Sequence, residues 1–326
     1  MRSFLRRLKR SADERGAIPA TETVEAVSAA EIVSNYWGAS RKKERPISWL
    51  EHKVILDFVY RRVTGDPNVG TYPWFKNRFF PKPAELCLSL GCGLGQFERN
   101  AISMGIARKF HAYDISKGAI ETARKAADES GLTDNIDYQV MSLDEVALPE
   151  ATYDAIFAIS SVHHVSNLEN LFQQCRKALK TNGLMFLDEY IGPTQFQTSP
   201  MITELINRLL VALPARYRKS LFANDGSTID RYMPSPVEHF LKTDPSEAIR
   251  SAEIIDILKR WFDIVEFRPY GGAIQHMLFS GITGNFDENS ETDAALLNII
   301  AMFEETLEKH GVIASDFAAI VARPKT

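Results

Sequence analysis

The sequence predicts an α/β protein built on a mostly parallel β-sheet with helices on both faces. Three observations point to this fold class. Between residues 84 and 193, short apolar runs alternate with segments of helical periodicity. The first apolar run leads directly into a glycine-rich turn at residues 91–95. The 326 residues are 45% hydrophobic and 25% charged, which is typical of a soluble globular protein.

The pattern divides the chain into five stretches. Residues 1–45 are polar and mixed in charge, and residues 46–83 carry a helical pattern followed by aromatic side chains. Residues 84–193 hold the alternating core. Residues 194–260 are expected to form a helical insertion or lid after the fifth strand, and residues 261–326 complete the sheet.

Each element is predicted from the local hydrophobic pattern and from the residues that begin or end helices and strands. Strands are expected at 85–90, 109–113, 136–141, 154–160, 184–188, 265–269 and 317–322. Helices are expected at 29–37, 47–63, 96–103, 116–130, 167–179, 202–213, 251–261 and 296–310. Ser116 can cap the helix that it begins, and Gly131 stops that helix.

The glycine turn is the most informative feature. Glycines at alternate positions, Gly91, Gly93 and Gly95, let the backbone bend sharply and approach a ligand closely. A helix beginning near Gln96 turns its free N–H groups toward whatever lies over the turn. A dinucleotide-binding turn has the spacing G-x-G-x-x-G. Here the third glycine comes one residue early, and Gln96 takes the last position, so a nucleotide-binding oxidoreductase is the least favoured alternative.

The spacing G-x-G-x-G resembles motif I of the class I S-adenosylmethionine (SAM)-dependent methyltransferases. The resemblance covers roughly residues 84–192, and the C-terminal strands more loosely. It implies a Rossmann-like sheet of seven strands, in which the last strand, 317–322, is antiparallel. It also implies an enzyme that uses SAM and releases S-adenosylhomocysteine.

Asp114 ends the second strand about twenty residues after the turn, where a carboxylate can accept hydrogen bonds from both ribose hydroxyls of an adenosine. The alternative is a residue that only starts the next helix near Ser116. Family members often carry an acid after the third strand, and Ser142 stands there instead. Ser142 or the backbone of Leu143 is expected to meet the adenine, or Asp144 if the loop is shifted.

The resemblance implies cofactor contacts along the turn and at the ends of the second to fourth strands. The predicted cofactor-binding residues are Ser89, Gly91, Cys92, Gly93, Gly95, Gln96, Phe97, Asp114, Ile115, Ser142, Leu143 and Ser160.

The histidine pair His163 and His164 follows the fourth strand and resembles that of methyltransferases of the ubiquinone and menaquinone type. Because ligands bind at the carboxyl ends of strands in this fold, the pair is expected near the methyl group, where histidine can take a proton. The alternative is that one histidine only orders the loop. Glu189, after the fifth strand, is a second candidate base or substrate anchor, or else an exposed loop carboxylate. His276 is a weaker candidate for the substrate pocket.

Methyl transfer from a sulfonium is an in-line displacement that needs alignment and exclusion of water, so no metal is predicted. Residues 194–250 are expected to cover the site, and Tyr36 and Trp37 to close the other side of the SAM pocket, with core packing as the alternative for both. The covering candidates are Phe222, Tyr232, Met233 and Phe240.

The acceptor is expected to be a small molecule or a glycan. The net charge of −4 gives no strong signal for nucleic acid. The basic residues 1–10 allow weak contact with a membrane surface, or else form a solvated terminus. The alternatives are a methyltransferase for a lipid quinone or an RNA base, and a SAM-binding regulator without turnover.

The three cysteines, Cys87, Cys92 and Cys175, lack metal-type spacing and predict reduced thiols in a cytoplasmic protein. No apolar run approaches the length of a membrane span. The sequence does not define the oligomeric state.

Overall fold

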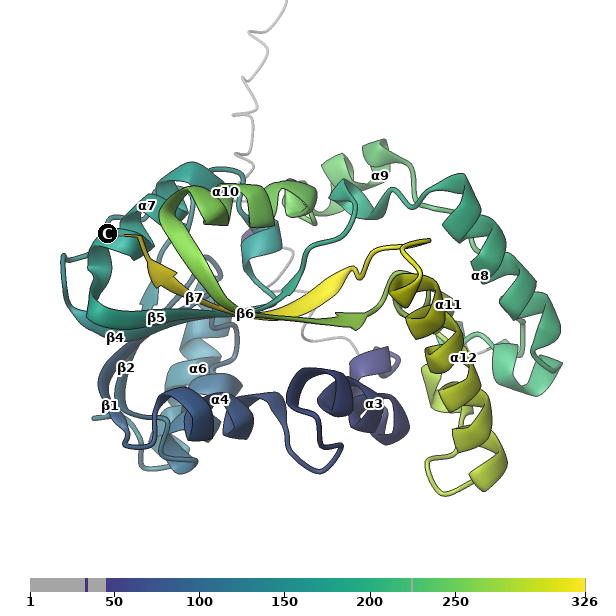
Figure 1. Cartoon of the computed structure of the whole chain (residues 1–326), viewed down its shortest axis with the longest axis horizontal. Coiled ribbons are helices and arrows are strands. Elements are labelled where there is room, and N and C mark those ends of the chain that lie inside the picture. The colour runs from purple at the N-terminus through teal and green to yellow at the C-terminus, as the bar shows by residue number, and fades with distance from the viewer. Residues whose placement is uncertain (1–32, 35–44, 224, 326) are drawn as a thin grey trace, which may run out of the picture.

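The computed structural model describes residues 33–34, 45–223 and 225–325 (Figure 1). Its centre is a seven-stranded sheet of order β3-β2-β1-β4-β5-β7-β6. β7 pairs antiparallel with β5 and β6, and all other neighbours pair in parallel. This confirms the predicted fold class. The strands are β1 (Ala84–Leu90), β2 (Ala107–Asp114), β3 (Ile136–Val140), β4 (Tyr153–Ile159), β5 (Leu179–Tyr190), β6 (Phe262–Gly271) and β7 (Phe317–Pro324).

Helices occupy most of the connections and cover both faces of the sheet. In Figure 1, α3, α4 and α6 lie below the sheet and α7 and α10 above it, while α8 and α12 stand at one end. The helices are α3 (Lys53–Thr64), α4 (Thr71–Phe79), α5 (Gln96–Ser103), α6 (Lys117–Glu129), α7 (Leu168–Ala178), α8 (Pro200–Ala212), α9 (Val237–Thr243), α10 (Ile254–Trp261), α11 (Gln275–Leu278) and α12 (Glu291–Lys309). Short 3-10 turns lie at Trp49–Glu51, Val162–His164, Thr194–Phe196, Ala215–Arg218, Ser251–Glu253 and Thr283–Asn285.

Most predicted elements are present, with bounds shifted by a few residues. The Ser116 cap is confirmed, since its hydroxyl accepts a hydrogen bond from the N–H of Ala119 at 3.3 Å. The fifth strand begins earlier than expected, at Leu179. Leu179 already pairs with Tyr153 of β4 across a register shift, so residues 180–183, which lie between the predicted helix 167–179 and the predicted strand 184–188, belong to the strand. Of the helix expected at 29–37, only residues 33–34 are described.

Helix α4 was not expected, because its aromatic residues mask the helical period. Its Phe75 is completely buried under the sheet. The Phe75 ring lies 4.7 Å from the ring of Phe186 and 5.4 Å from that of Phe157, measured between centroids. These contacts fix α4 beneath β4 and β5.

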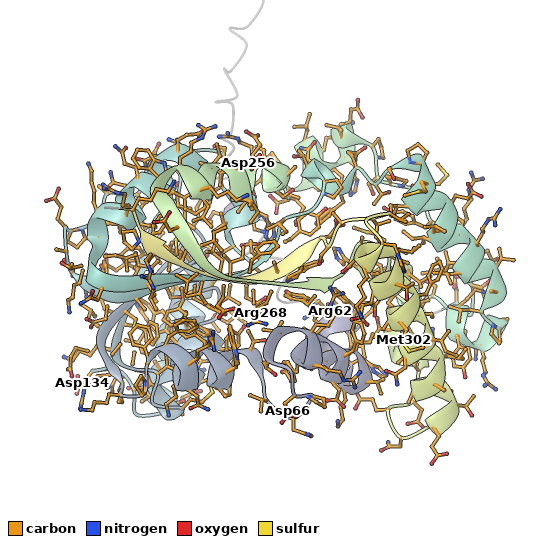
Figure 2. All side chains as sticks on the ribbon, viewed as in Figure 1. Arg62, Asp66, Asp134, Asp256, Arg268 and Met302 are labelled. Carbon is orange, nitrogen blue, oxygen red and sulfur yellow. The ribbon has the colours of Figure 1, made fainter. Side chains whose placement is uncertain are left out.

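Side chains fill the space on both sides of the sheet (Figure 2). Arg62 of α3 reaches Glu308 of α12 in an ion pair of 2.6 Å, of which both partners are largely buried. The pair joins the lower layer to the helix at the end of the molecule. In the part of the chain that the structure describes, no helix is long and apolar enough to cross a bilayer.

Replacing Phe75 with alanine removes an entire buried ring and leaves a cavity under β4 and β5. The Phe75→Ala change is expected to lower the free energy of unfolding by roughly 3–5 kcal/mol, measured by urea denaturation. Val211→Ala is the matched control, because Val211 is 73% exposed and should change stability by less than about 0.5 kcal/mol. Equal effects of the two changes would contradict this account of the core.

Candidate active site

A cavity of about 220 Å³ lies at the carboxyl ends of the parallel strands. Gly91 follows β1, Asp114 ends β2, Ser142 follows β3 and Ser160 follows β4, and all four line this cavity. Parallel strands place their carboxyl ends at one edge of the sheet, where α/β proteins bind ligands. Seven predicted site residues therefore come together there: Gly91, Asp114, Ile115, Ser142, Leu143, Ser160 and His164.

The turn after β1 requires its glycines. Gly91, Gly93 and Gly95 have φ angles of 68°, 54° and 71°, which disfavour any residue with a Cβ. A Cβ at Gly91 would overlap Ser161, and one at Gly95 would overlap the hydroxyl of Tyr138. The backbone of the turn can therefore come closer to its neighbours, and to a ligand, than any other sequence would allow.

Asp114 ties the turn to the end of β2. One carboxylate oxygen accepts a hydrogen bond from the N–H of Gly93 at 2.8 Å, and the other accepts one from the N–H of Ser116 at 2.8 Å. Asp114 thus also orders the start of α6, as the alternative interpretation held. It lines the cavity at the same time, so one side chain shapes the turn and faces the ligand space.

Ser142, Leu143 and Asp144 line the cavity together after β3. The Asp144 carboxylate accepts hydrogen bonds from the N–H groups of Ser166 and Asn167, both at 2.8 Å. Asp144 therefore holds the entry to α7, and Ser142 stays in the position expected to meet an adenine.

The remaining predicted cofactor contacts do not line the cavity: Ser89, Cys92, Gly93, Gly95, Gln96 and Phe97. The Phe97 ring packs on Phe157 at 5.1 Å in the core, and the Gln96 amide bonds to Asn100 at 2.9 Å. Side-chain contact with a cofactor at these positions stays a prediction.

Glu98 is a buried carboxyl that no sequence pattern singled out. The Ser89 hydroxyl donates a hydrogen bond to one of its oxygens, and the other has no partner among the described residues. Burial raises the pKa of Glu98 to about 7. In sequence it resembles any acid in a first helical turn, so only the fold reveals it.

Ser160 carries backbone strain at the end of β4. Its φ of 48° is left-handed, which is unusual for a residue with a side chain. The next residue, Ser161, donates its hydroxyl proton to the carbonyl of Leu90 at 2.8 Å, joining the ends of β1 and β4. The strained residue lines the cavity.

Glu189 lies beneath the cavity with no exposed surface, so its interpretation as an exposed loop carboxylate is wrong. One oxygen accepts hydrogen bonds from the N–H groups of Ser161 and Val162, at 2.8 and 2.7 Å. The other contacts Nδ1 of His163 and accepts from the N–H of Tyr190 at 2.7 Å. Glu189 therefore fixes the loop after β4 and the ring of His163.

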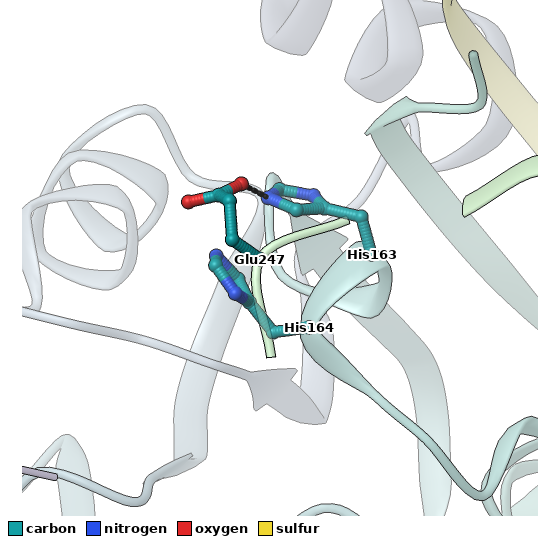
Figure 3. A group of neighbouring side chains, drawn as sticks. All are labelled: His163, His164 and Glu247. Atoms are coloured by element: carbon teal, nitrogen blue, oxygen red, sulfur yellow. Dashed lines mark ion pairs between the residues drawn. The ribbon is translucent and has the colours of Figure 1, made fainter. Parts of the chain in front are cut away.

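Glu247, from the insertion, completes the group that Figure 3 shows. Its Oε1 lies 3.6 Å from Nε2 of His163, which therefore stands between two carboxylates. Beside it, Nδ1 of His164 lies 3.1 Å from the hydroxyl of Ser246. No sequence signal pointed to Glu247, because it meets the histidines only through the path of residues 194–260.

The pKa values of the two histidines are shifted in opposite directions. Burial disfavours a charge on His163, but Glu189 and Glu247 outweigh it and raise the pKa of His163 above its ordinary value. Burial and the neighbouring His163 hold the pKa of His164 well below its ordinary value. Burial also raises the pKa of Glu247 to about 7, against the effect of His163.

His163, His164 and Glu247 also have the composition of a metal site. Each offers one ligand atom, and these atoms lie within 4.8 Å of one another. Two imidazoles and a carboxylate can bind zinc with a position left open. Within the protein, Nε2 of His163 and Oε1 of Glu247 already face each other, and Nδ1 of His164 contacts the hydroxyl of Ser246.

His276 does not line the cavity. Its ring packs among aromatic side chains, 5.4 Å from Phe196 and 5.2 Å from Phe317. Burial and, less strongly, the neighbouring His163 lower the pKa of His276 to about 4.

The cover of the cavity differs from the expectation. Phe222 and Met233 are 66% and 64% exposed and do not line the cavity. Tyr232 and Phe240 do not line it either. Apolar side chains at the surface of an insertion are easily mistaken for lining residues in a sequence. The insertion covers the cavity through Pro245, Ser246 and Ile249 instead.

Val33, near the start of the described chain, lines the cavity on another side. The hydroxyl of its neighbour, Ser34, lies 3.2 Å from the carbonyl of Ile115 and donates to it. Tyr36 and Trp37, expected to close this side, lie outside the described residues, as does the basic segment 1–10.

Comparison with known proteins identifies a domain within the chain. Residues 88–187 match the family model described as a methyltransferase domain. The chain is 31% identical over 113 residues to a ubiquinone biosynthesis O-methyltransferase of Methylocella silvestris, covering 34% of this chain and 43% of that protein. It is 23% identical over 164 residues to the 27-O-demethylrifamycin SV methyltransferase of Amycolatopsis mediterranei, covering 50% and 55%.

A solved structure shares the fold. The geranyl diphosphate C-methyltransferase of Streptomyces coelicolor A3(2) superposes with a TM-score of 0.51 at 12% identity, over 93% of this chain and 100% of that one. The chain spans about half the length of the curated relatives it matches. Residues 88–187 match a methyltransferase domain, and this is the segment whose motifs resemble those of the class I SAM-dependent methyltransferases.

Glu189→Gln tests the buried carboxylate. The amide keeps the size of the side chain but replaces one accepting oxygen with an NH₂ group, so the buried N–H groups that donate to that oxygen lose their acceptor. The free energy of unfolding is expected to fall by about 2–4 kcal/mol in urea denaturation. Glu85→Gln, at an exposed ion pair, should cost less than about 1 kcal/mol. A cost for Glu189→Gln no larger than that of the control would refute the role given to this carboxylate.

The two histidines are expected to give pH profiles of opposite slope. The pKa of His163 is raised in the folded protein, so its contribution to stability is present below its ordinary pKa of 6.5 and is lost as the pH rises through the folded value. The pKa of His164 is lowered, so the wild type loses stability as the pH falls below 6.5. The free energy of unfolding of the wild type, His163→Gln and His164→Gln is measured from about pH 5 to about pH 9. The stability difference between wild type and each variant should change with pH in opposite directions for the two histidines. A change in the same direction would count against the assignment.

Proposed function

We propose that this protein is an enzyme that transfers the methyl group of SAM to an oxygen, nitrogen or carbon nucleophile of a small-molecule acceptor. The observation that carries the proposal is the cavity at the carboxyl ends of β1, β2 and β4, which is lined mostly by residues of the methyltransferase domain. Its lining combines the glycine turn with Asp114 and with the polar backbone after β3.

The cavity has the features that SAM requires. The glycine turn leaves no Cβ to obstruct the amino-acid part of the cofactor, and Asp114 offers carboxylate oxygens to the ribose. Ser142 and Leu143 line the same cavity, and we expect the adenine to lie beside them. When bound, SAM supplies a methyl group already attached to a good leaving group. The remaining work of the protein is to align the acceptor and exclude water.

His164 is the better placed of the two histidines to receive the acceptor's proton. It lines the cavity, and its low pKa keeps the imidazole neutral near pH 7. His163, held between Glu189 and Glu247, favours its charged form and positions the loop. Glu189 acts through His163.

A lipophilic acceptor is the second candidate. The curated relatives include a ubiquinone biosynthesis O-methyltransferase. Apolar side chains are exposed on the insertion, among them Phe222 and Leu241, which is 55% exposed. Weak contact with a membrane surface through the basic N-terminus and a glycan acceptor remain predictions from the sequence. The net charge of −4 gives an RNA acceptor little support.

A cytoplasmic location is also part of the proposal. Cys87 and Cys175 are buried thiols, and burial raises the pKa of each. Sparse cysteines of this kind suit a reducing compartment. Fractionation of the cells that make the protein, followed by immunoblotting, tests it; recovery outside the cytoplasm would overturn it.

Replacing Asp114 with alanine tests the cofactor site. Loss of the carboxylate should weaken SAM binding by more than about tenfold in calorimetry. Because Asp114 also holds the glycine turn, thermal unfolding of each protein is measured alongside. Asp263→Ala, at an exposed position on β6, is the matched control and should leave the affinity unchanged. Unchanged affinity in Asp114→Ala would remove Asp114 from the site.

Incubation with labelled SAM and host extract, followed by identification of the labelled product, tests turnover. Release of S-adenosylhomocysteine together with a labelled small molecule is the expected result. A regulator without turnover would bind SAM tightly and release none. Label in the RNA fraction would make the protein an RNA methyltransferase, and titration by NADH in place of SAM would make it an oxidoreductase; either result would overturn the proposed function.

A further inference from the structure

A second cavity, of about 360 Å³, lies at the same edge of the sheet as the first. It is formed where β5 ends, where β7 begins and where α8 starts, and it shares no lining residue with the first cavity. Its wall is mostly apolar, with side chains that include Ile191, Met201, Ile202, Ala273, Val312 and Ile313.

Asp316 places a carboxylate in this apolar wall. The residue is only 9% exposed, and what is exposed borders the cavity. Its backbone is held at the edge of the sheet, since its N–H donates to Gly271 at 3.2 Å and its carbonyl accepts from Ile191 at 2.7 Å. Within the described chain, no hydrogen bond or ion pair reaches its carboxylate. Buried polar groups without partners are costly and rare.

The position of this carboxylate depends on a glycine. A Cβ at Gly192 would lie 2.5 Å from Cγ of Asp316 and 2.7 Å from the ring of Tyr190. The absence of a side chain at Gly192 therefore opens the space that the carboxyl group occupies. The backbone bonds and this space together hold one acceptor group at a fixed place in the cavity.

The surrounding charges favour a cation. Burial, together with Glu304 and Glu308 of α12, raises the pKa of Asp316 to about 7. Arg62 is already paired with Glu308, and Glu304 accepts from the amide of Gln275 at 2.7 Å. The charge of Asp316 also acts on Tyr190 and Tyr232: burial and then this charge raise the pKa of each phenol. A positive group brought by a ligand would relieve this accumulation of acids.

We propose that this cavity binds an ammonium group carried on an apolar body, with Asp316 as its counter-ion. An ionised carboxylate only accepts hydrogen bonds, so the ligand must donate them. A charged donor gains more than a neutral one in such surroundings. The apolar wall takes up the rest of the ligand.

The assignment of this amine as part of the methyl acceptor rests on the proposed function. Both cavities open along the carboxyl edge of the sheet, one beside β1, β2 and β4 and the other beside β5 and β7. The ammonium group is then an anchor, and the atom that receives the methyl group lies elsewhere on the acceptor. Amine binding itself needs no SAM, so it is measured without the cofactor.

Calorimetry on the full chain at about pH 8, with hexan-1-amine and hexan-1-ol as probes, tests the site. The amine should bind the wild type at least about tenfold more tightly than the alcohol does. Asp316→Asn should weaken amine binding at least about tenfold and leave the alcohol unaffected. Asp263→Asn, which makes the same change of charge at an exposed position, should bind the amine as the wild type does. Absence of amine binding, or equal binding to wild type and Asp316→Asn, overturns the proposal.

Two further measurements separate this site from folding and from the SAM site. Thermal unfolding of Asp316→Asn at about pH 8 should occur at or above the wild-type temperature, because the change removes an unpaired buried charge. The difference in unfolding temperature between Asp316→Asn and the wild type should shrink toward pH 5, where Asp316 is protonated in the folded state. If Asp316→Asn unfolds at a lower temperature than the wild type at about pH 8, the carboxylate has a stabilising partner in the protein, and the proposal is overturned. SAM affinity should be unchanged in Asp316→Asn, so failure here is distinct from failure of the Asp114→Ala test.

Discussion

The close approach of the chain at the ends of β1 and β4 is the constraint on which the candidate site depends. Gly91 lies against Ser161, whose hydroxyl bonds back to the carbonyl of Leu90. That contact exists only because Gly91 has no Cβ. From it follow the left-handed turn, the attachment of Asp114 to Gly93, and the open space above the strand ends.

A buried carboxyl group, that of Glu189, organises the next layer. Glu189 accepts hydrogen bonds from N–H groups of the loop after β4 and orients the ring of His163. His163 in turn forms an ion pair with Glu247 of the insertion. The chain of contacts joins the core of the domain to the segment that covers its cavity. The two histidines also differ in charge, since burial and then the charge favoured on His163 lower the pKa of His164 and keep it neutral.

The fold could be predicted almost entirely from local patterns, because strand, turn and helix signals act over a few residues. The exceptions were α4, whose aromatic residues mask its period, the short helices α9 and α11, and the early start of β5, which depends on pairing with Tyr153. Part of the candidate site could also be predicted from the sequence. Gly91, Asp114 and Ser142 carry their own local signals, whereas Glu98 resembles an ordinary surface acid until α5 packs on β1.

The sequence by itself therefore determined the sheet, the glycine turn and the acid at the end of β2, because each is written in neighbouring residues. Only the tertiary structure decided which buried groups meet. Glu247 reaches His163 across 84 positions of chain. The Asp316 carboxylate has no hydrogen bond or ion pair among the described residues, while Arg62 and Gln275 bond to Glu308 and Glu304 of α12. Burial and long-range contact set the charge states of these groups, and no local pattern encodes either.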